Sequence, residues 1–364
     1  LINMEASFIF KEFLERTIDT KKYDFRSTKR FINNSKRENY LFNSSINGIE
    51  EADLILLIGT NPRFEATMIN ARIRKAYLSN NTRVVSLNDL GDLTYNYQSL
   101  NGKVKTIKDI FENNNELSKE IIESKKPMIV FGESFFRIKS ASHLFNLSKK
   151  FLSKNNKLND DWNPINILSV DAATVGNLDL DIIDKNNKIL DELHENKFEI
   201  IFLLGQDNLD FKKKDEFIIY QGSHGDRGAE IADIILPGAA YTEQSGHYTN
   251  LEGKLQKAYK ASYPPGNAKE DWQIINDLAE VMNNRKLFND KDELESSMFN
   301  YLKMNKDQQT SELDHELNES DFSDEFLKVD YKDYYFSNVI ARSSKTMLEC
   351  NNAKVDLKKT GTEG

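Results

Sequence analysis

The sequence predicts an α/β protein built on doubly wound, mostly parallel sheets. Short apolar runs alternate along the chain with longer amphipathic stretches, which is the pattern of strands alternating with helices. One run, residues 53–58, is apolar after its first residue, as expected for a strand covered on both faces of a parallel sheet. Several runs end in glycine-containing turns, at Gly59, Gly132, Gly205 and Gly222, and such turns direct ligand sites to the carboxyl edge of a sheet.

The elements are predicted in order from periodicity. Residues 4–18 form an amphipathic helix, because Phe8, Ile9 and Phe13 recur near helical spacing among charged residues. This helix is expected to pack on the chain's own sheet or on a further N-terminal part, and residues 23–39 form a polar loop. The remaining predicted elements are strands at 53–58, 83–87, 127–131, 165–170, 199–204 and 217–220, and helices at 65–78, 107–124, 139–151 and 268–282.

These elements divide the chain into three parts. Residues 1–282 are predicted to form one α/β domain, of one or two subdomains. Residues 283–333 are acidic and polar, so one or two short helices on a poorly constrained surface are expected there. Residues 334–364 are expected to form a C-terminal tail.

Composition limits the function classes. The 364 residues carry a net charge of −9, which argues against a nucleic-acid-binding protein because such proteins present a basic face. No apolar run approaches the roughly 20 residues of a membrane-spanning helix. The first residues include Glu5 and Glu12, and they match neither a secretory signal nor an Arg-rich transit peptide.

Residues 217–272 are the most informative segment. They hold a large share of the 16 glycines and 6 prolines of the chain, and each glycine is expected to mark a tight turn or a close backbone approach. Such a layout is typical of a backbone that wraps a large polar ligand, or of a surface inherited from one. The glycines concerned are Gly222, Gly225, Gly228, Gly238, Gly246 and Gly253.

Three blocks of sequence together resemble a known family. The first is Asp233-Ile-Ile-Leu-Pro-Gly-Ala-Ala-Tyr-Thr-Glu243, which is followed by Asn250-Leu-Glu-Gly253. The second surrounds Ile58-Gly-Thr-Asn-Pro-Arg-Phe-Glu-Ala66, and the third, a weaker match, is Ala341-Arg-Ser-Ser-Lys-Thr-Met347. These blocks resemble the molybdopterin oxidoreductases, and more narrowly the large iron–sulfur subunit of NADH:ubiquinone oxidoreductase, respiratory complex I.

The resemblance implies a fold, a role and partners. The fold would be that of the molybdopterin oxidoreductases, which is also the fold of formate dehydrogenases. The role would be structural support in the peripheral arm of complex I, on the matrix side of the mitochondrial inner membrane or the cytoplasmic side of a bacterial plasma membrane. The expected partners are other complex I subunits, especially the cluster-bearing N-terminal half of the same subunit and the flavin- and NADH-binding subunit. Contact with the membrane would then be indirect, through the complex.

Cysteine usage limits the chemistry of the chain. It has one cysteine, Cys350, and five histidines, whereas an iron–sulfur cluster needs about four thiolate or histidine ligands. The family's 4Fe-4S and 2Fe-2S clusters lie in a cysteine-rich N-terminal part, which this sequence lacks. We therefore expect it to cover only the C-terminal portion, either because the subunit is split into two polypeptides or because the sequence is truncated.

Two interpretations apply to the turn from Gly59 to Arg63. It follows a predicted strand and precedes a helix, so its backbone amides could hold a phosphate. The resemblance implies contact with a pterin dinucleotide at this loop, although the complex I version of the domain is regarded as having lost that cofactor. The alternative, which we favour, is that Asn61-Pro62 simply makes a turn and Gly59 relieves crowding.

No histidine has a convergent partner in the sequence. His224 lies between glycines after a strand, where a base or ligand could be exposed, but nothing at liganding spacing accompanies it. His247 has Glu243 nearby, in what we expect to be a surface contact. His143, His194 and His315 are expected to be solvated.

We therefore predict no catalytic, cofactor-binding or metal-binding residues in this chain. An active molybdenum enzyme of the family would bring a Cys, selenocysteine or Ser to the metal, and neither Cys350 nor Ser134 lies in a supporting motif. Nucleophile elbows, Walker A loops and Gly-x-Gly-x-x-Gly fingerprints are also lacking. Two alternatives remain open: an active molybdopterin-dependent oxidoreductase domain, and a free nucleotide-binding α/β protein.

Overall fold

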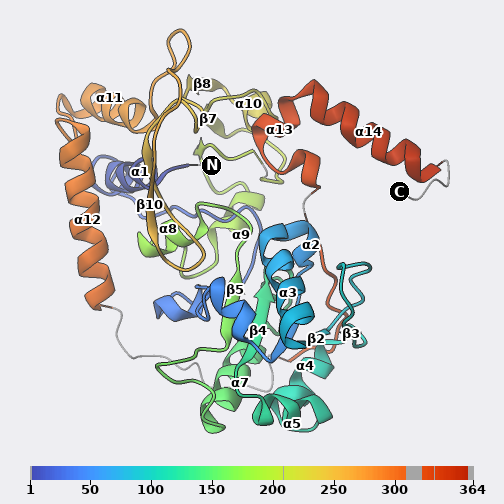
Figure 1. Ribbon diagram of the computed structural model, residues 1–364. Helices are drawn as coiled ribbons and strands as arrows, with labels where there is room; N and C mark the ends of the chain where they lie inside the picture. The colour runs from blue at the N-terminus through green and yellow to red at the C-terminus, as the bar shows by residue number, and fades with distance from the viewer. Residues whose placement is uncertain (1, 208, 309–321, 332, 360–364) are drawn as a thin grey trace.

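The computed structural model describes residues 2–207, 209–308, 322–331 and 333–359, and its largest unit is a five-stranded parallel sheet (Figure 1). The strand order is β3-β2-β1-β4-β5, so the chain starts in the middle of the sheet and winds outwards in both directions. The prediction of a doubly wound parallel sheet is confirmed. The strands are β1 (Leu54–Ile58), β2 (Arg83–Ser86), β3 (Gln98–Ser99), β4 (Pro127–Gly132) and β5 (Ile165–Leu168).

Both faces of this sheet are covered, which explains why β1 is apolar throughout. Leu56 enters a cluster with helices on one face, and Ile55 enters a second cluster on the other face. The first face is covered by α4 (Val104–Phe111), α5 (Glu116–Glu123), α6 (Glu133–Phe136) and α7 (Ala141–Lys154). The second face is covered by α3 (Thr67–Asn80), together with Trp162 and a 3-10 turn at Asn47–Glu51.

Two predicted helices differ from the observed ones. The single helix expected at 107–124 is two helices, because Asn113 is left-handed at φ 63° and Asn115 starts α5 by accepting a hydrogen bond from Leu117 N at 3.0 Å. The helix expected at 65–78 is preceded by a short separate helix, α2 (Pro62–Glu65). Both differences arise from local capping, which overrides the helical spacing of the apolar residues.

A second, smaller sheet is also parallel. It has three strands in the order β6-β7-β8, namely β6 (Ile200–Leu204), β7 (Phe217–Gly222) and β8 (Ile234–Pro237). One face packs on a cluster beside α9 (Ile189–His194) and α10 (Arg227–Ile231). The edge strand β8 is exposed, and Ile235 has 53% of its surface accessible.

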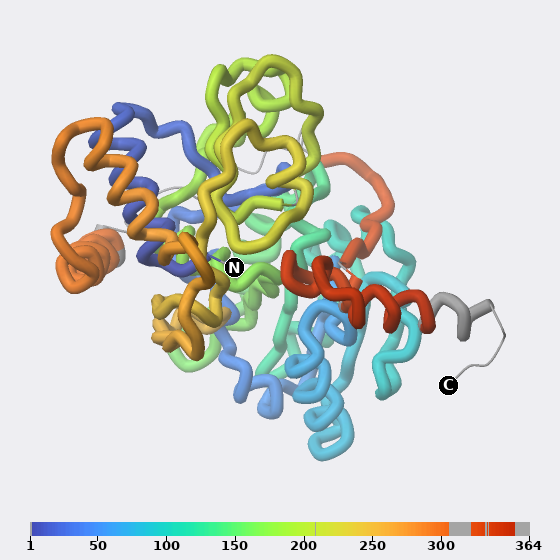
Figure 2. The backbone as a smooth tube through the Cα atoms, turned by 90° about the horizontal axis from the view of Figure 1, so that it is seen from above, coloured from blue at the N-terminus to red at the C-terminus, as the bar shows by residue number. Residues whose placement is uncertain are grey.

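A helical layer and a hairpin adjoin the second sheet. The helices are α1 (Met4–Arg16), α8 (Thr174–Asp179), α11 (Asp271–Asn283) and α12 (Lys291–Gln308), and the hairpin joins β9 (Gly246–Thr249) to β10 (Leu255–Ala258). Figures 1 and 2 show α1, α11 and α12 side by side. Helix α1 therefore packs within this chain, on α11, α12 and β9.

The segment after residue 282 is better packed than predicted. Leu294, Met298 and Leu302 of α12 are buried against α1, so the expectation of a poorly constrained surface is wrong there. Residues 322–331 return to the five-stranded sheet, where Leu327 is buried and its amide donates to Gly102 O at 2.8 Å. The acidic composition of this segment led to the wrong prediction. The helical spacing of Leu294, Met298 and Leu302 would have indicated a buried helix face.

The C-terminal segment forms α13 (Val339–Ser343) and α14 (Lys345–Lys359). Helix α14 extends outwards from the body in both views (Figures 1 and 2). Among the described residues, no helix combines the length and the apolar character needed to cross a bilayer.

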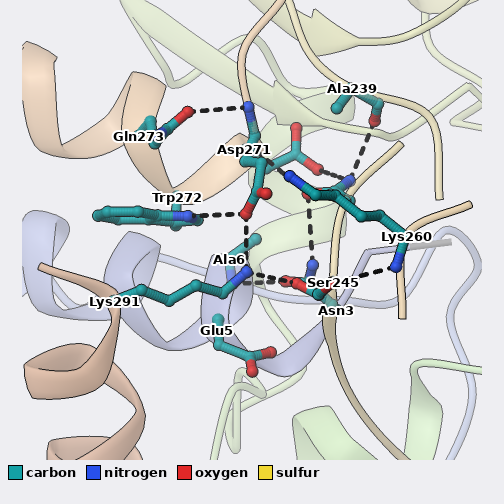
Figure 3. A network of polar contacts seen from close by, with 12 residues as sticks. Asn3, Glu5, Ala6, Ala239, Ser245, Lys260, Asp271, Trp272, Gln273 and Lys291 are labelled. Atoms are coloured by element: carbon teal, nitrogen blue, oxygen red, sulfur yellow. Dashed lines mark hydrogen bonds and ion pairs between the residues drawn. The ribbon is translucent and has the colours of Figure 1, made fainter. Parts of the chain in front are cut away.

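A buried carboxylate, Asp271 at the start of α11, joins the second sheet to the helical layer (Figure 3). Its two oxygens accept hydrogen bonds from Gln221 Nε2 at 2.9 Å and from Gln244 Nε2 at 2.7 Å. Gln244 in turn accepts a hydrogen bond from Asn3 Nδ2, at 3.3 Å, which ties in the start of α1. Burial raises the pKa of Asp271, and the two amide hydrogen bonds act in the opposite direction.

The glycines of residues 217–272 explain part of this close packing. A Cβ at Gly238 would lie 2.5 Å from Asp271 Oδ1, and a Cβ at Gly246 would lie 2.5 Å from Asn3 Nδ2. Both positions therefore need glycine, as predicted. Gly225 is the exception, because no described atom lies within 4 Å of its Cβ position and its φ is not positive.

We predict that Asp271→Ala destabilises the chain by about 2–4 kcal/mol, because two buried glutamine amides each lose the carboxylate acceptor and keep only a backbone carbonyl. Urea unfolding of the purified chain measures this loss. The matched control is Asp277→Ala on the same helix, where the half-exposed carboxylate pairs with Lys269 at 2.7 Å and its removal should change stability by about 0.5 kcal/mol or less. Equal losses in the two variants would show that Asp271 does not hold the two layers together.

A second prediction concerns β1. Leu56→Asp places an unpaired carboxylate at a position with 1% exposure, at a cost of several kcal/mol out of the roughly 5–15 kcal/mol that stabilise a domain. We expect loss of the cooperative unfolding transition in circular dichroism. Leu78→Asp in α3, at 59% exposure, is the control and should unfold as the unmodified chain does. A folded Leu56→Asp variant would contradict the burial of this strand.

Candidate functional site

The turn after β1 is built by local capping. Gly59 has φ 68°, and a Cβ at this position would lie 2.5 Å from Phe135 N, so α6 packs directly on the turn. Asn61 then caps α2 by accepting a hydrogen bond from Arg63 N at 3.2 Å, with Pro62 as the first helical residue. The prediction that Gly59 relieves crowding is confirmed.

The hydrogen-bond donors of this turn are bound by a carboxylate of the chain itself. Glu65 Oε2 accepts hydrogen bonds from Thr60 Oγ1 at 2.7 Å and from Asn61 N at 2.5 Å. Burial raises the pKa of Glu65, and the hydrogen bonds from Thr60 and Asn61 oppose that rise. An anionic side chain thus lies where a phosphate would be held at a strand-to-helix turn.

The carboxyl edge of the second sheet has its own group of polar residues. The Asp207 carboxyl, after β6, interacts with the Tyr220 hydroxyl, in β7, and burial raises the pKa of both groups. The Tyr220 hydroxyl also lies 3.2 Å from His224 O. Arg342 of α13 reaches this edge from the C-terminal segment, with Nε 2.5 Å from Asp226 Oδ2.

His224 takes no part in a convergent site among the described residues. Its Nδ1 lies 2.9 Å from Ser223 Oγ. Among the described residues, the side chains that lie close enough together to hold a metal ion are those of Glu5, His247 and Glu295, and His224 is not one of them. Cys350 is exposed on α14. The hydroxyl of Ser134 accepts a hydrogen bond from Asp330 N at 3.0 Å and so helps to dock residues 322–331.

His247 is buried, and the prediction of a surface contact with Glu243 is wrong. Glu5 of α1 lies against it, with Oε1 2.5 Å from His247 Nδ1 and Oε2 2.8 Å from His247 N. Burial opposes ionisation of Glu5, but the hydrogen bonds from His247 outweigh it and lower the pKa of Glu5. The partner lies 242 residues away in sequence, so no local pattern could have revealed it.

Glu5, His247 and Glu295 offer ligand atoms within 4.8 Å of one another. Each already has a partner in the chain, since Glu5 binds His247 and both oxygens of Glu295 lie 3.1 Å from Lys257 Nζ. The group is therefore satisfied by hydrogen bonds between Glu5 and His247 and by the Glu295–Lys257 ion pair, which together join α1, β9, β10 and α12.

The other histidines are placed as follows. His143 is buried in α7, contrary to the expectation that it is solvated, and neither ring nitrogen has a partner among the described residues. It lies there because α7 turns it towards Phe322, in the segment that returns to the first sheet. His194 is exposed, as expected, and His315 lies outside the described residues.

Comparison with known proteins identifies two family matches. Residues 1–281 match the molybdopterin oxidoreductase family, and residues 293–350 match the C-terminal region of the G subunit of NADH-ubiquinone oxidoreductase. The two matches together cover both the sheets and the segment that contains α12 and α13.

Individual relatives agree with these matches. The NADH-ubiquinone oxidoreductase 75 kDa subunit of Reclinomonas americana is 35% identical over 375 residues, which cover 97% of this chain and 54% of the relative. The mitochondrial 78 kDa subunit of Candida albicans is 37% identical over 341 residues, covering 86% and 45%. The G subunit of the NADH-quinone oxidoreductase of Rickettsia bellii is 35% identical over 371 residues, covering 99% and 53%.

The chain thus spans about half the length of the curated relatives it matches. The resemblance to the large subunit of complex I, first suggested by three sequence blocks, is confirmed by these relatives. With a family match over residues 1–281 and a parallel α/β structure, the chain belongs to the molybdopterin oxidoreductase family.

Proposed function

We propose that this chain supports the peripheral arm of respiratory complex I as part of its large iron–sulfur subunit, and that it binds no cofactor itself. Electrons from NADH would reach ubiquinone through 4Fe-4S and 2Fe-2S clusters held by the N-terminal part of that subunit and by other subunits. The names of the relatives, which are subunits of NADH-ubiquinone or NADH-quinone oxidoreductases, support the assignment to this complex.

The observation that carries the proposed loss of cofactor is the position of Glu65. Its carboxylate already accepts the hydrogen bonds of Thr60 and Asn61, the donors that a dinucleotide phosphate would need at this turn. A phosphate beside an ionised Glu65 would meet like-charge repulsion, and displacing Glu65 would bury its carboxylate without partners. The residues present at the turn therefore do not fit the phosphate of a pterin dinucleotide.

The proposal also covers the subunits that the chain contacts, the side of the membrane on which it lies and the division of the chain into segments. The partners are the cluster-bearing N-terminal part of the subunit, the flavin- and NADH-binding subunit and other complex I subunits, with no nucleic acid and only indirect contact with the membrane. The place is the matrix side of the mitochondrial inner membrane, or the cytoplasmic side of a bacterial plasma membrane. Division of the chain into 1–282, 283–333 and 334–364 is supported by the separate family matches to 1–281 and 293–350.

We predict that the purified chain carries no stoichiometric iron, molybdenum or flavin. A single cysteine cannot ligate a cluster, and the donors of the β1 turn are bound by Glu65. Elemental analysis and an absorption spectrum of the purified chain test this, with the assembled complex measured in parallel as the iron-containing control. One molybdenum atom per chain would instead favour the active molybdopterin-dependent oxidoreductase, and stoichiometric iron would contradict the expected absence of a cluster.

A further prediction is that His224→Ala and Cys350→Ala leave the rate of NADH oxidation per assembled complex unchanged. His224 contacts Ser223 and Cys350 is exposed on α14, so neither side chain belongs to a convergent site among the described residues. Native gels and rates from the same samples separate assembly from catalysis.

The matched comparison is Leu56→Asp, which should lower the amount of assembled complex without changing the rate of each complex that forms. If either alanine variant assembles normally but loses about tenfold in rate, roughly 1.4 kcal/mol of barrier, the chain takes part in catalysis and the supporting role is wrong.

A further inference from the structure

A small cavity of about 30 Å³ lies at the carboxyl ends of β4 and β5. Glu133, which follows β4, and Ser169, which follows β5, line it together with Arg30 from the 23–39 loop and Thr174 at the start of α8. By size it admits about two water molecules or one small ion, since a single water needs roughly 10–15 Å³.

Arg30 contributes a buried guanidinium group whose donors are mostly unused by the protein. The residue is 7% exposed, and Nη1 donates to Glu133 Oε2 at 2.6 Å. Within the described part of the chain, this is the single acceptor bound by its side chain. A guanidinium has five N–H donors, so Nε and Nη2 remain available to an occupant that carries acceptor groups.

Thr174 supplies a second unsatisfied group on the wall of the same cavity. It is 3% exposed, and its Oγ1 is buried without a hydrogen-bond partner among the described residues. Its backbone amide is engaged separately, with Asp171 O at 3.1 Å. A buried hydroxyl without a partner is costly, so an occupant that accepts its hydrogen bond would be stabilising.

Arg30 brings a positive charge to the wall of the cavity, and the carboxylate beside it is already bonded. Both oxygens of Glu133 are engaged: Oε2 lies 2.6 Å from Arg30 and 3.7 Å from Arg137, and Oε1 accepts from Val170 N at 3.1 Å. Two guanidinium groups thus face one fully bonded carboxylate, and Arg137 also lies 3.4 Å from Asp330 Oδ2. Glu65, whose Oε2 accepts hydrogen bonds from Thr60 and Asn61, interacts electrostatically with Glu133 and is a second carboxylate near this group.

We propose that this cavity binds a small oxyanion, held by the Arg30 guanidinium and the Thr174 hydroxyl. A guanidinium presents parallel N–H groups that match two oxygens of such an ion. The cavity is too small for a dinucleotide, so the ligand class is free phosphate, sulfate or bicarbonate. The site is separate from the turn at Gly59, and it stands independently of the proposed role in complex I.

The test is thermal unfolding of the purified chain in a phosphate-free buffer to which inorganic phosphate, sulfate or bicarbonate is added at increasing concentration. Sodium chloride at matched ionic strength is the control. A ligand of the folded state raises Tm saturably as its concentration exceeds Kd. We expect such a rise with at least one oxyanion and none with chloride. A response to phosphate and sulfate identifies a tetrahedral ligand, and a response to bicarbonate identifies a planar one.

Three variants locate the response. Thr174→Val should keep Tm at or above that of the unmodified chain without oxyanion, because it removes an unpartnered hydroxyl, yet weaken oxyanion affinity about tenfold. Arg30→Lys keeps the charge beside Glu133 but should abolish the saturable response. The matched control is Thr82→Val, which removes a buried hydroxyl bonded to Ala52 O at 2.7 Å; it should lower Tm and leave the response intact.

Three results would overturn the proposal. The first is the absence of a saturable response to all three oxyanions in the unmodified chain. The second is a Thr174→Val variant whose Tm responds to oxyanions as that of the unmodified chain does. A Thr174→Val variant that loses stability without oxyanion, as Thr82→Val does, would also overturn it, because the Thr174 hydroxyl would then already be hydrogen-bonded to water. Since each result concerns oxyanion binding by the chain alone, failure here leaves the supporting role in complex I to be decided by its own experiments.

Discussion

The arrangement of this chain depends on one buried carboxylate, Asp271. Its oxygens bring together Gln221 at the end of β7 and Gln244 before the hairpin, and Gln244 binds Asn3 at the start of α1. Segments separated by as many as 241 residues thus meet in one network of hydrogen bonds (Figure 3). Burying an acid is unfavourable unless its oxygens are satisfied, so the network constrains α1, β7 and α11 to one relative placement.

The same arrangement explains how α1 stabilises the chain. With Asn3 held in the Asp271 network, Glu5 lies against His247, and the next turns bury Phe8 and Phe13 against α11 and α12. Apolar packing supplies the larger part of the free energy, and the polar contacts select one register for the helix. A helix at the start of the sequence therefore acts as the centre of a layer whose other members lie near residues 178, 275 and 298.

Sequence patterns predicted the elements whose burial follows from their own composition. The run at 53–58 and the strand at 127–131 were identified because a strand covered on both faces must be apolar throughout. Contacts between segments that are distant in the sequence leave no local pattern by which they could be predicted. The contacts of Glu5 with His247 and of Arg342 with Asp226 form only when the whole chain has folded. Apolar composition alone was also insufficient, because Ile235 is apolar yet half exposed on the edge strand β8. Burial there depends on what covers the strand, which its residues do not encode.

The candidate site shows the same division between local and distant causes. The Gly59 turn was recognisable from Asn61-Pro62, whereas its occupation by Glu65 depends on how α2 folds back on the strand. At the carboxyl edges of both sheets, the donors of Thr60, Asn61 and Gln221 find acceptors within the chain. A fold that satisfies its strand-end donors internally is stable without a ligand, as the proposed supporting role requires. Arg30 and Thr174 depart from that rule among the described residues: Arg30 donates to a single acceptor, Glu133, Thr174 Oγ1 has no partner, and both residues line a cavity. That departure is why a ligand is expected between them and not at the turn.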